Sequence, residues 1–284
     1  MHSSAIMRVP PDTYSFESQS LGLEGVINAR ELGGYELPDG SHVKKGKLLR
    51  GGCLQLVTRN DVDKLSGELK VCQIFDFRTE METRHFPDAD IPGASRLWLP
   101  TIDERTEKPG ETSLPHEAYA DLAKYLLMHS SEKFVQEVAH NLYPSLVTNE
   151  YTQLQYAAFL QIIANHPGDT FYWHCSQGKD RTGLGAAFLL AALGADRELI
   201  LADYNISADY YHDEVWALGA QVLRLGGGED ELKVIRTFIG VNTEYFVETL
   251  DIIENQYGGM EAYLRNQLCL TDADRAALKA KFLE

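Results

Sequence analysis

The sequence predicts a single α/β domain in which a mostly parallel central sheet is flanked by helices. Its 284 residues suffice for one large domain, and 44% hydrophobic with 24% charged residues is typical of globular proteins. Short apolar segments, such as "KVCQIFDF" and "TFYWHC", have the pattern of buried strands. Longer segments repeat apolar residues every three or four positions, which is typical of helices packed on a sheet.

The first predicted feature is a hairpin. Residues 26–37 and 44–52 both have an extended pattern, and the sequence "PDG" between them predicts a turn.

A helix and two strands are expected next. Residues 58–69 predict a helix, because Thr58 can cap its N-terminus and the apolar residues that follow share one face. Residues 70–77 and 94–102 each predict a buried strand, with a loop between them.

The remainder is predicted to be mostly helical. Residues 116–166 have helical periodicity, and the aromatic segment 170–175 interrupts them as a strand. An Ala/Leu-rich helix follows at 181–194, with Gly194 as its C-cap. The glycine-rich segment 225–230 predicts a break, or hinge, in the last helical region.

The charge excludes one class of partner. With 26 basic and 42 acidic residues the net charge is −16, which repels nucleic acid and anionic bilayers at long range. Any anion that the protein handles must therefore be attracted by a local site.

The cysteines indicate neither a disulfide scaffold nor a zinc site, because the four of them lie far apart and lack metal-ligand spacing. We expect reduced thiols, no metal and no cofactor. No signal peptide or membrane span is apparent, so a cytoplasmic location is expected, with secretion without a signal left open.

The segment "HCSQGKDRTG" is the candidate site. It places a cysteine six residues before an arginine, in a glycine-containing loop between an apolar strand and an apolar helix. Backbone N–H groups at such a helix N-terminus form an anion cradle and favour a thiolate on Cys175. Cys175 can also be interpreted as a small buried apolar residue, because free cysteines are often buried.

Other loop residues have distinct expected roles. Arg181 can hold two phosphoryl oxygens with a bidentate fork and follow them into the transition state. Thr182 is placed to donate a hydrogen bond to the sulfur, and His174 is expected to order the loop rather than act as a base. Ser176, Gln177 and Gly178 contribute to the cradle.

This loop resembles the H-C-x5-R-[ST] signature of Cys-based phosphatases. In detail it is similar to the "HCxxGKDRTG" loop of the bacterial tyrosine phosphatase family typified by mycobacterial protein tyrosine phosphatase B. The segments "INARELGGY", "LLRGG", "IFDFRTEME" and "ILADYNIS" also resemble family motifs. The resemblance implies a Cys-phosphatase fold and a two-step reaction through a phosphocysteine, without a metal.

The resemblance covers about residues 23–283, so we expect a phosphatase domain over 23–284 and an N-terminal extension over 1–22. The sequence departs from the family pattern at Ala29, Glu31 and Gly51, where an aromatic residue, an aspartate and a serine are expected. The family resemblance also implies that helices between about residues 205 and 241 form a lid.

Two aspartates compete as the general acid. Asp180 lies inside the loop and resembles the aspartate of "DRT" loops in lipid-directed Cys phosphatases. Asp76 ends a predicted strand, whose carboxyl end a parallel sheet would bring beside the loop. Structural alternatives are a helix cap for Asp180 and an ion pair with Arg78 or Arg50 for Asp76.

Two basic side chains near the site each have two alternative roles. Lys179 either binds an anionic group of the substrate or is a solvated loop lysine. Arg30 either supports the site from behind or forms a surface ion pair.

We therefore predict a protein tyrosine phosphatase. A phosphoinositide or inositol phosphate phosphatase with the same loop is the alternative, because of the "KDR" sequence. A phosphate-binding module without turnover is a third interpretation. Such a module would be recognised by the loss of Cys175 or Arg181, and both residues are present. The sequence does not indicate the oligomeric state.

Overall fold

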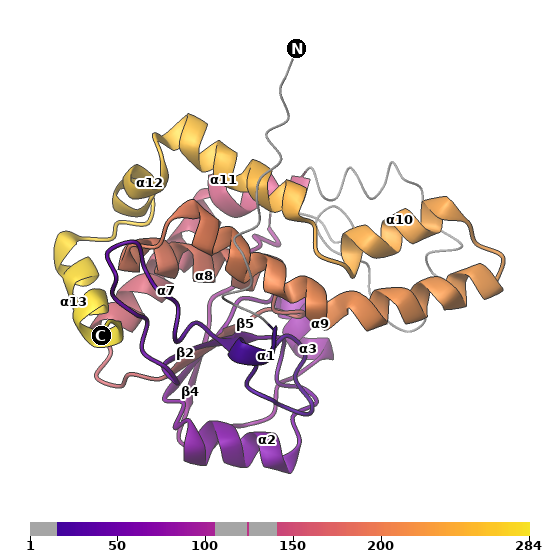
Figure 1. The fold of residues 1–284 in the computed structure, drawn as a ribbon, viewed down its shortest axis with the longest axis horizontal. Coiled ribbons are helices and arrows are strands. Elements are labelled where there is room, and N and C mark those ends of the chain that lie inside the picture. Colours follow the sequence, from indigo (N-terminus) through magenta and orange to yellow (C-terminus); the bar gives the residue numbers. More distant parts are fainter. Residues whose placement is uncertain (1–15, 106–123, 125–140) are drawn as a thin grey trace.

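The protein has one five-stranded, mostly parallel sheet with helices packed against it (Figure 1). The computed structural model describes residues 16–105, 124 and 141–284. The strand order is β1-β2-β5-β3-β4, and only β1 runs antiparallel to its neighbour. The strands are β1 (Arg30–Glu31), β2 (Leu48–Gly51), β3 (Gln73–Asp76), β4 (Ser95–Trp98) and β5 (Phe171–His174). The predicted α/β class and parallel sheet are confirmed. The prediction that residues 94–102 form a buried strand is wrong in part, because β4 lies at the edge of the sheet and its residues Ser95, Arg96 and Trp98 are exposed.

Strand register brings three chain segments to one edge. His174, the last residue of the central strand β5, pairs with Gly51 on one side and with Asp76 on the other. Because these strands are parallel, the loop after β5 emerges between the carboxyl ends of β2 and β3. This is where open parallel sheets gather their ligands.

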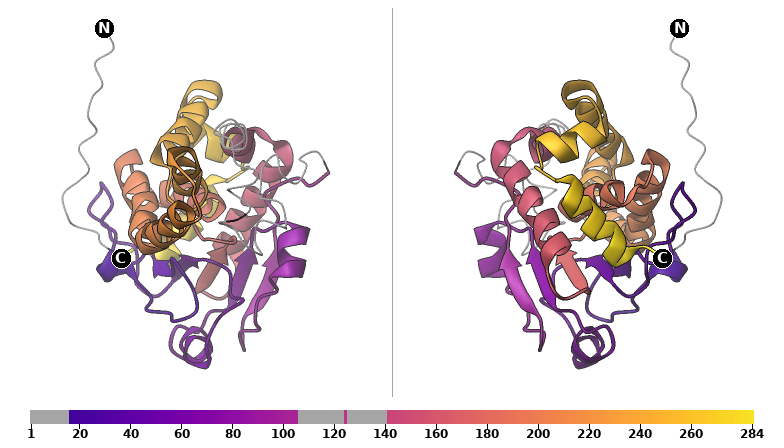
Figure 2. Two further views of the ribbon diagram at one scale, coloured as in Figure 1. Left: turned by 90° about the vertical axis from the view of Figure 1, so that its right-hand side faces the viewer. Right: turned by 90° about the vertical axis from the view of Figure 1, so that its left-hand side faces the viewer.

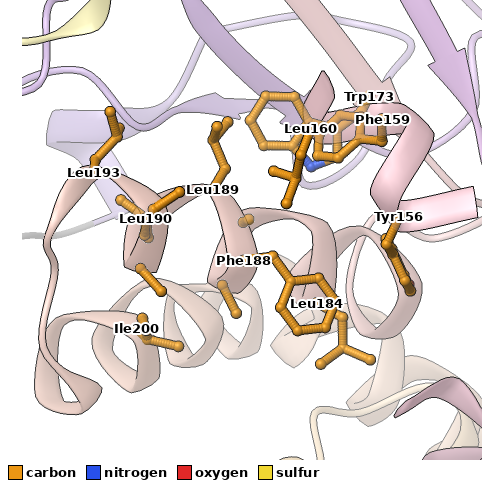
Figure 3. Packing of buried hydrophobic residues seen from close by; sticks show 14 of the residues in the cluster. Tyr156, Phe159, Leu160, Trp173, Leu184, Phe188, Leu189, Leu190, Leu193 and Ile200 are labelled. Atoms are coloured by element: carbon orange, nitrogen blue, oxygen red, sulfur yellow. The ribbon is translucent and has the colours of Figure 1, made fainter. Parts of the chain in front are cut away.

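Side chains alternate between two cores, as successive strand residues must. Phe171 and Trp173 belong to the main core, which helices cover, whereas Tyr172 belongs to a smaller core on the opposite face. Figure 2 shows the C-terminal helices gathered on one side of the sheet. Figure 3 shows Phe188 and Leu189, from the helix that follows β5, in the main core together with Trp173 and Phe159.

Capping residues mark the starts of several helices. The short α1 (Phe16–Gln19) opens the described chain. The expected helix at 58–69 is α2 (Arg59–Asp63), capped by Thr58, and it continues as a π-helical turn, η1 (Lys64–Glu68). Thr79 caps α3 (Glu80–His85).

The predicted helical region 116–166 is described only in part. Residues 141–148 are helical and α7 (Glu150–Asn165) follows, whereas residues 116–123 and 125–140 lie outside the described residues. The loop helix is α8 (Asp180–Leu193), and it ends at Gly194, whose φ of 115° is the left-handed C-cap conformation.

The last ninety residues form five helices: α9 (Arg197–Arg224), α10 (Glu229–Phe238), α11 (Thr243–Tyr257), α12 (Met260–Asn266) and α13 (Asp272–Phe282). The break predicted at 225–230 separates α9 from α10, which then runs back alongside α9 (Figure 1). We call residues 205–241 the helical hairpin. Among the described residues, no helix has the length and apolar character needed to cross a bilayer.

Candidate active site

The loop between β5 and α8 is built around Gly178. Its φ is +69°, and a side chain there would overlap the backbone of Gly51. A side chain at Gly51 would in turn overlap the hydroxyl of Tyr172. This explains why position 51 departs from the family serine, because Tyr172 already fills the space.

The carbonyl groups of the loop are bonded outward, by donors from other parts of the chain. The donors are the backbone N–H of Cys53 to Ser176 (3.1 Å), Tyr211 Oη to Gln177 (2.5 Å), and Asn28 Nδ2 and Arg50 Nη2 to Gly178 (2.9 Å each). In a trans peptide the N–H points opposite to the carbonyl. The amides that follow these carbonyls therefore point into the loop, which makes the predicted anion cradle.

Cys175 is the first residue of this cradle. It is 3% exposed and lies between the end of β5 and the N-terminus of α8. Its burial agrees with both interpretations made from the sequence. The surrounding cradle favours the nucleophile, because a purely structural cysteine does not require outward-bonded carbonyls around it.

Arg181 is held by a carboxylate that the sequence did not single out. Glu82 on α3 accepts two parallel bonds, from Nη1 to Oε2 and from Nη2 to Oε1, both 2.7 Å. Ser176 Oγ donates to the same carboxylate. Burial opposes the charge on Glu82, but Arg181, Ser176 and the backbone of Thr79 together lower its pKa to about 2. The plane of the guanidinium is thereby fixed at the loop.

The Glu82 pair predicts an acid-sensitive stability. A carboxyl group whose pKa falls from 4.5 to about 2 on folding stabilises the native state fully above 4.5 and loses this contribution as pH falls towards 2. Glu82→Gln is therefore expected to show a smaller loss of stability than wild type between pH 4.5 and 2, although it is less stable at pH 7. Urea unfolding across this range measures the difference, and parallel pH curves would contradict it.

Asp76 and His174 lie in a buried charged cluster behind the loop. Arg78 binds Asp76 through two nitrogens, at 2.9 and 2.7 Å, and Asp88 at 2.7 Å. His174 lies 3.3 Å from Asp88, and its Nδ1 contacts the carbonyl of Cys175 at 3.1 Å. The expected ion pair of Asp76 with Arg78 is therefore present, as is the ordering contact of His174.

In this cluster the acidic and basic groups stabilise one another's charged forms. Burial favours neutral forms, but Asp76 and Asp88 raise the pKa of His174, and His174 with Arg78 lowers that of Asp88 to about 2. Ligand atoms of Asp76, Asp88 and His174 come within 4.8 Å of one another, as in a metal site. Arg78 supplies the positive charge there, because it contacts both carboxylates directly.

Asp180 begins α8, and its carboxylate faces two phenols. Its Oδ1 accepts hydrogen bonds from Tyr143 Oη (2.6 Å) and from Tyr204 Oη (3.0 Å). Burial, followed by the charge of Asp180, raises the pKa of both phenols well above 10, so both remain donors. Asp180 is half-buried, unlike Asp76, and it forms no salt bridge with any residue that the structure describes.

Lys179 and Thr182 differ from their expected surroundings. Lys179 is 2% exposed and donates to three carbonyls of the helical hairpin, so the solvated-lysine interpretation is wrong. The hydroxyl of Thr182 is buried, and among the described residues it has no hydrogen-bond partner. Its bond to the sulfur stays a prediction.

Arg30 and Arg50 are completely buried and share Asp203 of α9. The surface ion pair considered for Arg30 is therefore wrong. Arg50 also donates to the carbonyls of Gly178 (2.9 Å) and Lys179 (3.3 Å). Burial and the neighbouring Arg30 lower the pKa of Arg50 to about 10, against the opposing effect of Asp203. The two arginines thus support the cradle from behind.

Comparison with known proteins agrees with this geometry. The model of the tyrosine phosphatase family matches residues 21–284. A protein of Cupriavidus necator named as a tyrosine-protein phosphatase is 26% identical over 286 residues, covering 100% of this chain and 96% of the relative. The triple specificity protein phosphatase PtpB of Mycobacterium tuberculosis is 24% identical over 244 residues, covering 79% and 86%. A tyrosine-protein phosphatase of Nostoc commune is 28% identical over 180 residues, covering 59% of each chain.

The family match includes every part of the site described above, from Asn28 to the hairpin carbonyls that Lys179 contacts. The resemblance inferred from the loop and its flanking motifs is confirmed, and the chain belongs to the tyrosine phosphatase family.

Proposed function

We propose that the protein is a Cys-dependent tyrosine phosphatase, which hydrolyses phosphomonoesters through a phosphocysteine on Cys175. The outward bonding of the loop carbonyls is the observation that carries this proposal, because it turns consecutive amides towards one point beside Cys175. Arg181 lies at the same loop with its plane fixed by Glu82. A thiol nucleophile, amide donors and a guanidinium are what phosphoryl transfer without a metal requires.

The reaction has two steps. In the first, the Cys175 thiolate forms a bond to phosphorus as the ester oxygen leaves with a proton from Asp180. In the second, water attacks the phosphocysteine, its proton passes to Asp180, and the thiolate departs with phosphate as the product. The cradle and Arg181 hold the phosphoryl oxygens throughout.

Asp180 suits the general acid better than Asp76. Both oxygens of Asp76 are bonded to Arg78, which holds this carboxylate behind the loop. On Asp180 both phenols donate to Oδ1, so Oδ2 is the oxygen that would carry the transferred proton. Tyr143 and Tyr204 would then fix the direction of that oxygen.

Asp180→Asn is expected to slow hydrolysis in proportion to the difficulty of the leaving group. General acid catalysis is worth roughly 10²–10⁴-fold, so phenyl phosphate should lose about this factor. p-Nitrophenyl phosphate should lose much less, since nitrophenolate leaves without a proton. Steady-state kcat/KM with the two esters is the measurement, because it reports the first step alone, whereas kcat also contains the second step that both esters share. An equal loss for both would contradict the assignment.

The substrate is proposed to be a phosphotyrosine-containing protein. The net charge of −16 disfavours close approach to anionic membranes, within a Debye length of about 8 Å, whereas a soluble phosphoinositide presents no such charged surface and is the alternative substrate. The mycobacterial relative is named a triple specificity phosphatase, which is the reason to test the alternative substrate as well.

Turnover of a phosphotyrosine peptide and of a soluble phosphoinositide, both without added metal, tests this proposal. A higher kcat/KM for the peptide is expected. Preference for the phosphoinositide would show that the protein is a phosphoinositide phosphatase instead. Hydrolysis of neither substrate would favour a phosphate-binding module without turnover.

A cytoplasmic location remains our proposal. All four cysteines, Cys53, Cys72, Cys175 and Cys269, are free. Unpaired thiols are the usual state in a reducing compartment, and a thiolate nucleophile must stay reduced to act. The extent of the phosphatase domain, 23–284, stays a prediction.

A further inference from the structure

Lys179 has an unusual environment for a lysine in a phosphate loop. Its ammonium donates to the carbonyls of Phe238 (2.6 Å), Ile239 (3.2 Å) and Gly240 (2.6 Å). An ammonium has three donors, and these three bonds use all of them. With the side chain 2% exposed, no donor remains for an anion in this conformation.

The three carbonyls lie at the C-terminal end of α10: Phe238 is its last residue, Ile239 is its C-cap and Gly240 follows. A helix leaves its final carbonyls without partners inside the helix, and a cation placed there also interacts favourably with the helix dipole. Since α10 has only ten residues, tertiary contacts such as this one must supply much of its stability.

The helical hairpin has few other means of attachment to the phosphate loop. Tyr211, Val222, Val234, Ile235 and Ile239 form an apolar cluster separate from the main core, so the outer part of the hairpin packs on itself. The base of the hairpin is anchored, because Ile206 lies in the main core and Ser207 accepts hydrogen bonds from Asn28 and Arg30. Figure 1 shows the end of α9 and α10 extending beyond the rest of the molecule. The outer part of the hairpin therefore resembles a unit that can move if its link to the loop is released.

Tyr211 provides the second link to the loop. Its hydroxyl donates to the carbonyl of Gln177 (2.5 Å), and Lys179 Nζ lies 5.6 Å from the centre of its ring. Two neighbouring loop residues, Gln177 and Lys179, thus hold the hairpin through one carbonyl and one ammonium.

We propose that Lys179 is a latch that ties the phosphate loop to the helical hairpin by capping α10. This extends the proposed function, because it assigns regulation of access to the same loop. A second anionic group on a substrate can bind Lys179 only by displacing the α10 carbonyls, so recognition of such a group and release of the hairpin are one event. Substrates with a single phosphate leave the latch closed.

The latch can be tested by hydrogen exchange of the intact protein without any substrate. Lys179→Met removes the three donors but keeps the length of the side chain. Amides of α10 are expected to exchange about tenfold faster or more, because charge-assisted hydrogen bonds are among the strongest single contacts. Lys179→Gln, which keeps two donors, should give an intermediate rate and serves if the Met variant does not fold.

Lys281 offers a matched control. Its ammonium caps the end of α7 through the carbonyls of Ile163 (2.9 Å), His166 (2.6 Å) and Gly168 (3.5 Å). Lys281→Met should accelerate exchange near residues 163–168 and leave α10 unchanged. The proposal is overturned if α10 exchanges at the wild-type rate in Lys179→Met, or if that variant accelerates exchange equally over the whole chain. Because turnover is not measured, failure here leaves the phosphatase assignment intact.

Discussion

Replacing Cys175 with serine is expected to abolish turnover while phosphate still binds. The serine hydroxyl is not ionised near neutral pH, so the loop loses its nucleophile, on the order of a 10⁶-fold effect in comparable covalent catalysis. The cradle is unaffected, because its amides are oriented by Asn28, Arg50 and Tyr211 rather than by the sulfur. Phosphotyrosine peptide turnover and calorimetric titration with inorganic phosphate measure the two properties.

Cys53→Ser is the control for this variant, because the hydrogen bond that Cys53 gives the loop comes from its backbone N–H, which serine keeps. It should retain wild-type turnover. Substantial activity in Cys175→Ser would contradict the nucleophile, whereas loss of phosphate binding in that variant would contradict the claim that the backbone builds the cradle.

Asp203→Asn is expected to destabilise the protein strongly. Arg30 and Arg50 are both fully buried, and Asp203 is the carboxylate that they share. Removing the negative partner of a buried ion pair typically costs about 3–5 kcal/mol, because it leaves an uncompensated charge in a low-dielectric interior. Tyr35 also loses a charged acceptor at 2.9 Å. Urea unfolding should show a lower midpoint with an unchanged slope.

An exposed ion pair provides the comparison. Asp251 pairs with Arg197 at 2.6 Å, but both side chains are about half exposed. Asp251→Asn should leave the unfolding midpoint within experimental error. If both variants lose similar stability, burial of the Asp203 cluster would not be the cause.

Sequence patterns predicted the parts of this protein that are local. The strands, the N-cap at Thr58, the left-handed C-cap at Gly194 and the strand-loop-helix unit around Cys175 all depend on residues close in the chain. Such features follow from periodicity and backbone stereochemistry, which short segments already contain.

The supporting residues were missed because they act over long separations. Glu82 binds Arg181 across 99 positions, and Asp203 binds Arg50 across 153. Both residues lie in segments that resemble family motifs, "IFDFRTEME" and "ILADYNIS", so the sequence marked these segments but not what the two carboxylates do. To assign their partners one must know which strand ends meet in the sheet.

The position of Lys179 was unpredictable for the same reason. Its partners begin 59 residues further along, at the end of a helix whose path depends on the break at 225–228. No pattern near Lys179 distinguishes a capped helix end from a bound anion, since both present oxygen acceptors to an ammonium.

The contact between Gly51 and Tyr172 has a consequence for how such sites diversify. A serine at position 51 would meet the Tyr172 hydroxyl, and without that hydroxyl the new Cβ would still lie 3.0 Å from Cα of Ala29 and 3.3 Å from the nearest ring carbon. Serine at 51 therefore requires both loss of the hydroxyl at 172 and a shift of a few tenths of an ångström in the backbone at 29. Among homologues, we expect tyrosine at 172 to be absent wherever position 51 is serine.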